Sequence, residues 1–138
     1  MGAWGYGFFE DDTACDFIYE IEEAENVRQL FQDSFEEAIN ADYLEYDAGH
    51  AVIVSVACID GILNGTKYNS GDEEDESDFS KIVTANKDMP LDGLKANAVQ
   101  ALQKVIGENS ELNELWSENE DDYSKWRQNI LDLMKRLK

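Results

Sequence analysis

Apolar residues recur at intervals of three and four over most of the chain, a spacing that is typical of amphipathic α-helices. Two such patterns lie near the N-terminus, over residues 12–24 and 26–38. Their apolar positions are Ala14, Phe17, Ile18, Ile21 and Ala24, followed by Val27, Leu30, Phe31, Phe35 and Ala38. Asp11 or Asp12 is expected to cap the first helix and Asn26 the second, because their side-chain oxygens can accept from the free N–H groups at a helix start.

Residues 47–64 are apolar nearly all round, which fits a central buried helix or, given the β-branched run from Val52 to Val56, a buried strand. We predict the helix, because the segment is longer than a typical strand and is rich in alanine. Asn64 and Gly65 are residues that can take the left-handed backbone conformation with which helices commonly end. The apolar run "AVIVSVACI" has about half the roughly 20 residues that a membrane span needs, so no membrane segment is predicted.

Three further helices are expected in the C-terminal half. Pro90 is well placed to open the first, which Gly107 ends. Ser110 caps a short helix over "ELNELW", and Asp121 or Asp122 begins the last one. The apolar residues of that last helix are Tyr123, Trp126, Ile130, Leu133 and Leu137. At this length the chain is expected to be one all-α domain over residues 1–138, a compact bundle of five or six helices.

The chain begins "MGAWGYGFFEDD", in which glycines are set among aromatic residues. Glycine permits tight turns and the aromatic rings are expected to insert into the core, so we predict a ribbon packed across the bundle. Glu10 stands where a nucleotide-binding GxGxxG motif needs its third glycine, so a phosphate site is not predicted. The residues given a structural role are Trp4, Gly5, Gly7, Phe8 and Phe9, together with Trp116 and Trp126 near the C-terminus.

The formal net charge is −20, and nearly all of it belongs to the first 80 residues. They hold 21 Asp and Glu but only Arg28 and Lys67, whereas residues 81–138 hold 10 acids and 9 bases. Residues 66–80 combine small polar residues with six acids and are expected to form a mobile loop. One interpretation is a solvated face that keeps the protein soluble, and the other is a docking surface for a basic partner.

The candidate partner-binding residues are the acids of the first two helices and of the acidic loop. They are Asp16, Glu20, Glu23, Asp33, Glu36, Glu37, Asp72, Glu73, Glu74, Asp75, Glu76 and Asp78. Carboxylates at helical spacing can imitate the phosphates of a nucleic-acid strand and occupy a basic cleft. Direct nucleic-acid binding is not predicted, because no basic stripe is present for phosphates.

The residues that usually carry catalysis or metal binding are sparse. His50 is the only histidine, and it is expected at the edge of the core. Cys15 and Cys58 have no metal-like spacing and are expected to be buried, inert thiols in a reducing cytoplasm. The acidic loop lacks the ligand pattern of an EF-hand, which leaves only weak calcium association as an alternative. The sequence therefore predicts no catalytic residue, no metal and no cofactor, and a cytoplasmic location.

The opening "MGAWGYGFFEDDTACDF" resembles the start of an uncharacterised, largely bacterial family, a domain of unknown function whose members begin Met-Gly-Ala-Trp-Gly. "NSELNELW" at residues 109–116 and "YSKWRQNILDLMKRL" at residues 123–137 are similar to later parts of that family. The resemblance implies a small all-helical domain and no known activity. This chain departs from the family pattern at Tyr6, where a small residue is commoner, and in its unusually acidic loop.

The leading functional hypothesis is a non-enzymatic interaction module, immunity- or inhibitor-like, whose acidic face binds a basic protein. This hypothesis is based on the uneven distribution of charge, because nearly all of the net negative charge lies in the first 80 residues. One alternative is a small metal-dependent or carboxylate-based hydrolase, because paired carboxylates abound. A second alternative is a structural or oligomerising domain.

Overall fold

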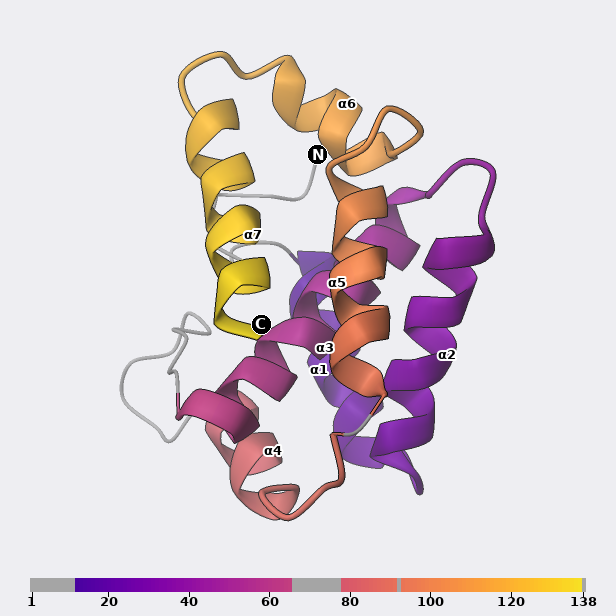
Figure 1. Ribbon diagram of the computed structural model, residues 1–138, viewed down its shortest axis with the longest axis vertical. Coiled ribbons are helices and arrows are strands. Elements are labelled where there is room, and N and C mark those ends of the chain that lie inside the picture. The colour runs from indigo at the N-terminus through magenta and orange to yellow at the C-terminus, as the bar shows by residue number, and fades with distance from the viewer. Residues whose placement is uncertain (1–11, 66–77, 92, 138) are drawn as a thin grey trace.

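The computed structural model describes residues 12–65, 78–91 and 93–137, and the regular elements within these ranges are all α-helices (Figure 1). In chain order they are α1 (Asp12–Glu23), α2 (Val27–Asn40), α3 (Tyr46–Asn64), α4 (Asp78–Ala85), α5 (Leu94–Val105), α6 (Glu111–Ser117) and α7 (Tyr123–Leu137). The all-α fold predicted from the sequence is confirmed. The alternative of a strand through Val52 and Val56 is wrong, since both residues lie within α3.

Helix α3 is the centre of the bundle, and it packs against each of the other six described helices. Residues 52–61 are all buried, which explains why this segment is apolar on every side. The helix ends as predicted at Gly65, where φ is +73° and the amide donates to the Gly61 carbonyl at 3.0 Å. A side chain with a Cβ rarely adopts this left-handed conformation, so glycine fixes the end of the helix.

Helix α3 is also the one described helix whose length and composition would allow it to cross a membrane. About two-thirds of its apolar stretch is buried inside the bundle (67%). A core helix of a globular domain has this same composition, because its neighbours cover it on all sides. The place of α3 at the centre of the bundle therefore accounts for its hydropathy.

Helices α1 and α2 both lie against α3 and bury most residues of their predicted apolar stripes; Ala24, Val27 and Leu30 are half-buried. Ile21 of α1 and Phe31 and Phe35 of α2 are almost completely buried. Asn26 caps α2 as expected, because its side-chain oxygen accepts from the Gln29 amide at 3.1 Å. The three residues 24–26 that join the two helices keep them close along the chain, so both can line the same region of the surface.

The C-terminal helices cover another part of α3 and also contact one another. The Ser110 hydroxyl caps α6 by accepting from the Asn113 amide at 3.3 Å. Trp116 of α6 and Trp126 of α7 are both buried and stack with ring centroids 5.9 Å apart. A backbone pairing at the same end of the bundle, in which Leu44 donates to Asn109 at 2.7 Å, ties the α2–α3 connection to the start of α6.

Three sequence predictions need correction. The described ranges contain seven helices, not five or six, because α4 forms in a segment over which the sequence pattern predicts no helix. Residues 78–80 open α4 and so do not belong to the acidic loop. Helix α5 begins at Leu94 and not at Pro90, because Gly93 before it has φ +82°, outside the helical region. The predicted N-terminal ribbon and the rest of the acidic loop, residues 66–77, lie outside the described residues.

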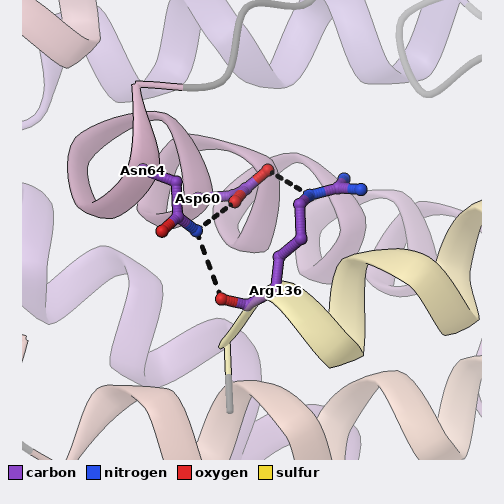
Figure 2. A network of polar contacts seen from close by, with 3 residues as sticks. All are labelled: Asp60, Asn64 and Arg136. Carbon is purple, nitrogen blue, oxygen red and sulfur yellow. Dashed lines mark hydrogen bonds and ion pairs between the residues drawn. The ribbon is translucent and has the colours of Figure 1, made fainter.

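One polar network joins the core helix to the C-terminal helix (Figure 2). Asp60 of α3 is completely buried, and its carboxylate accepts from Arg136 Nε of α7 at 2.9 Å. The other carboxylate oxygen accepts from Asn64 Nδ2 at 2.7 Å, and that same nitrogen donates to the Arg136 carbonyl at 3.2 Å. A buried charge with these partners fixes where the last turn of α7 rests on α3.

Candidate functional site

The acids of α1 and α2 lie on helical stripes with identical spacing. Thr13, Asp16, Phe17 and Glu20 follow the order i, i+3, i+4, i+7 on α1, and Leu30, Asp33, Ser34 and Glu37 follow the same order on α2. Residues at these intervals lie on one face of an α-helix. Each helix therefore presents a stripe in which acidic side chains alternate with smaller or apolar ones.

These two stripes line the same groove, which has a volume of about 530 Å³. The start of α3 completes it with Glu45, Asp47, Ala48 and Ala51. Six carboxylates thus line one hollow, and none of its lining residues is Lys or Arg. We call this hollow the acidic groove; its carboxylates are Asp16, Glu20, Asp33, Glu37, Glu45 and Asp47.

The six carboxylates are exposed to solvent, whereas other lining residues are buried or half-buried. Phe17 and Ser34 are each only 9% exposed, and the Ser34 hydroxyl donates back to the Leu30 carbonyl at 3.0 Å. Leu30, Ala48 and Ala51 are half-buried, so part of their apolar surface lies in the groove. The groove therefore combines an apolar floor with acidic walls.

Four of the sequence-predicted acids meet in this groove, namely Asp16, Glu20, Asp33 and Glu37. Glu23 and Glu36 are exposed on the same helices but do not line it. Of the loop acids, Asp72, Glu73, Glu74, Asp75 and Glu76 lie outside the described residues; Asp78 is the first residue of α4, and its side chain also lies outside the description.

Sequence reasoning missed Glu45 and Asp47. Both lie at the start of α3, where Glu45 is the residue before the helix and Asp47 lies in its first turn. An acid in a first turn interacts favourably with the helix dipole, and this was the only local signal for Asp47. That the start of α3 lies beside α1 and α2 is a property of the tertiary fold, and the pattern of either helix alone does not contain it.

A second hollow of about 670 Å³ lies at the other end of the α1–α2 pair, where α4 packs. Its lining mixes both signs of charge, with Arg28 and Lys81 beside Glu22, Glu25 and Asp88. Arg28 is already held there, since its Nε donates to the Pro90 carbonyl at 3.1 Å. This mixed lining favours no particular ligand charge, in contrast to the single sign of the acidic groove.

Neither His50 nor Cys58 lines the groove. His50 is 5% exposed and its ring packs edge-on against Tyr46 with centroids 4.7 Å apart. Cys58 is completely buried in α3, and this burial raises the pKa of its thiol well above the ordinary value. The side chain of Cys15 lies outside the described residues. Within the described ranges, no group of three or more His, Cys, Asp and Glu side chains is arranged to hold a metal ion.

A protein-family model described as Domain of unknown function (DUF4259) matches residues 2–129 of the chain. This match covers most of the described helices and includes every residue of the acidic groove. No curated protein and no solved structure matches the chain.

Proposed function

We propose that this chain, which belongs to the DUF4259 family, is a non-enzymatic interaction module that binds a basic protein in its acidic groove. The observation that supports the proposal most strongly is that all the charged side chains lining the groove are negative. Six carboxylates converge from three helices or their ends without one Lys or Arg among the lining residues. The described part of the chain does contain bases, but none of them lines the groove.

Electrostatics explains why such a groove favours a basic partner. Carboxylates that face one hollow add their potentials, and the low-dielectric protein wall strengthens the field inside it. Asp16 and Glu20 repel each other along α1, as do Asp33 and Glu37 along α2, at a cost of a few tenths of a kcal/mol per pair. A partner that places Lys or Arg between the two helices removes this repulsion and gains attraction to both walls.

The most concrete form of this role is an immunity- or inhibitor-like protein in the cytoplasm. A nuclease or another nucleic-acid-binding protein carries a basic cleft for phosphates. Carboxylates repeated along helices α1 and α2 offer such a cleft negative charges at regular intervals. By occupying the cleft, the acidic protein would exclude the nucleic acid.

The two alternative functions have less support from the geometry. A carboxylate that acts as a general acid usually lies in a pocket that excludes water, whereas the groove carboxylates are exposed to solvent. An oligomerising domain needs an exposed apolar patch. The exposed large apolar residues in the described ranges are Tyr19 on α1, Tyr43 just before α3 and Leu63 near the end of α3, so Tyr43 and Leu63 lie at opposite ends of that helix.

The proposal is tested with a peptide of alternating Lys and Gly, titrated at low salt into ¹⁵N-labelled protein. We expect amide shift changes at Asp16, Glu20, Asp33 and Glu37. We also expect a variant with these four acids changed to Asn or Gln to bind about tenfold more weakly, because each exposed charge pair contributes roughly 0.2–1 kcal/mol.

A matched control removes the same four charges elsewhere. Glu108, Glu118, Glu120 and Asp121 are exposed and lie outside the groove, so E108Q/E118Q/E120Q/D121N changes the net charge equally. We expect this control to bind nearly as tightly as the parent protein. Equal weakening of both variants would mean that the peptide senses only the overall charge, and the groove would lose its proposed role.

A further inference from the structure

Resting on the proposed function, we infer that the element received by the acidic groove is an amphipathic basic α-helix of the partner, lying lengthwise between α1 and α2. The charge of the groove indicates a basic partner but does not indicate whether the bound element is a helix, a strand or a loop. Three features of the groove lead to a helix: its floor, its two acidic walls and its length.

The floor requires an apolar side of the partner. Leu30 of α2 and Ala48 and Ala51 of α3 are half-buried, and Phe17 of α1 lies with them in the lining. A purely charged segment would leave this apolar surface in contact with water or would desolvate its own charges against it. A partner with an apolar stripe covers the floor and gains the free energy of burial.

The two walls require positive charge on both sides of that apolar stripe. Asp16 and Glu20 stand on α1, and Asp33 and Glu37 stand on α2. An extended strand has only two faces, which point in opposite directions, so it cannot place apolar residues on the floor and bases on both walls. A helix can, because its side chains radiate all round the axis and a narrow apolar stripe is flanked by residues on either side.

The length and the floor side chains also suit a helix. On each wall the lining residues extend over eight residues, 13–20 and 30–37, and the seven steps between the ends correspond to about 10 Å or two helical turns at 1.5 Å per residue. The floor is built partly of the small residues Ala48 and Ala51, whose short side chains keep the hollow between the walls open. Recognition of an amphipathic helix in a groove between helices is a recurrent binding mode, read through anchors at i, i+3, i+4 and i+7. A second copy of this chain is a poor occupant, since each copy carries a net charge of −20.

The test compares two synthetic peptides of one composition, built from Leu, Lys, Arg and Ala. In the first, Leu forms one stripe flanked on both sides by Lys and Arg; in the second, the same residues are permuted so that Leu is spread round the helix. We expect the first peptide to bind the full chain at least about tenfold more tightly in fluorescence anisotropy, and to gain helical circular dichroism on binding. We also expect Leu30→Gln, which keeps the charge, to weaken the first peptide and leave the second unchanged.

The outcomes separate this inference from the proposed function. Equal affinity for the two peptides, or tighter binding of the permuted one, overturns the helix and leaves a basic partner of another shape. Failure of both peptides, together with failure of the Lys-Gly peptide, overturns the proposed function itself. The comparison uses the unaltered protein, so it stands even where Leu30→Gln unfolds the domain.

Discussion

The completely buried carboxylate of Asp60 is held by Arg136 Nε at 2.9 Å, across 76 positions of the sequence (Figure 2). Asp60 lies on the central helix and Arg136 in the last turn of α7, so this contact fixes the end of the C-terminal helix against the core. Burial of a charge costs several kcal/mol, and the contacts with Arg136 and Asn64 help to offset that cost.

Replacement of Arg136 by Met should therefore destabilise the protein. It leaves a buried carboxylate without its cation, and we expect the free energy of unfolding to fall by about 2 kcal/mol, less than for a fully buried pair because the Arg136 side chain is 36% exposed. Urea denaturation measures the change. The double variant D60N/R136M should recover part of the loss, and additive single effects would show that the two residues do not interact.

Substitution of Gly49 by Ala should also destabilise the protein, although alanine normally favours a helix. A Cβ at Gly49 would stand 2.6 Å from Leu112 Cδ1, and Leu112 is completely buried. The cost of overpacking is about 1–3 kcal/mol, which exceeds the gain in helix propensity of about 1 kcal/mol. Thermal unfolding should show a net loss of about 1 kcal/mol. The double variant G49A/L112V, with one carbon fewer at the contact, should be more stable than G49A alone, and an unchanged loss would refute the steric cause.

The phenol of Tyr43 should titrate at unusually high pH. Its hydroxyl donates to Glu114 Oε2 at 2.9 Å, and this bond raises the pKa of Tyr43 to about 12 from its ordinary value of 10.0. The folded protein holds this proton more tightly than the unfolded chain, so the stability from this contact is complete below pH 10 and is lost as the pH rises toward 12. Alkaline titration followed by tyrosine absorbance should lose its latest step in Glu114→Gln, and a curve unchanged from the parent would exclude the carboxylate as the cause.

Helix α3 was predictable because several local signals agreed on it. The segment is too long for a strand, it is rich in alanine, and Gly65 can take the left-handed conformation that ends a helix. For helix α4 the local signals did not agree, because the segment follows an acidic run and has few apolar residues, among them Ile82 and Val83. It packs against α3 and α1, contacts that no local pattern reveals. The start of α5 was misplaced because Pro90 can open a helix or precede one by several residues.

The candidate site was predictable only in part for a similar reason. Asp16, Glu20, Asp33 and Glu37 were found because helical spacing placed them away from the apolar stripes. That the two stripes face one hollow, and that Glu45 and Asp47 close it, depends on how α1, α2 and α3 pack. Helical periodicity thus gives the faces, while packing between helices decides which faces meet.

A groove kept for a partner should lower the stability of the free protein, and this can be measured. The variant D16N/E20Q/D33N/E37Q removes two like-charged i, i+4 pairs and the repulsion across the groove. We expect it to be more stable than the parent by about 0.5–1 kcal/mol at low ionic strength, from a few tenths of a kcal/mol per pair. The gain should shrink as salt is added, because the Debye length falls to about 3 Å at 1 M and exposed charges no longer repel each other.

The control E108Q/E118Q/E120Q/D121N lies in the half of the chain that holds 10 acids and 9 bases, so it should bring little gain or a small loss of stability. Urea denaturation of both variants in low and high salt makes the comparison. If the groove variant gains nothing over the control, its carboxylates do not repel one another, and the electrostatic reason for a basic partner is removed.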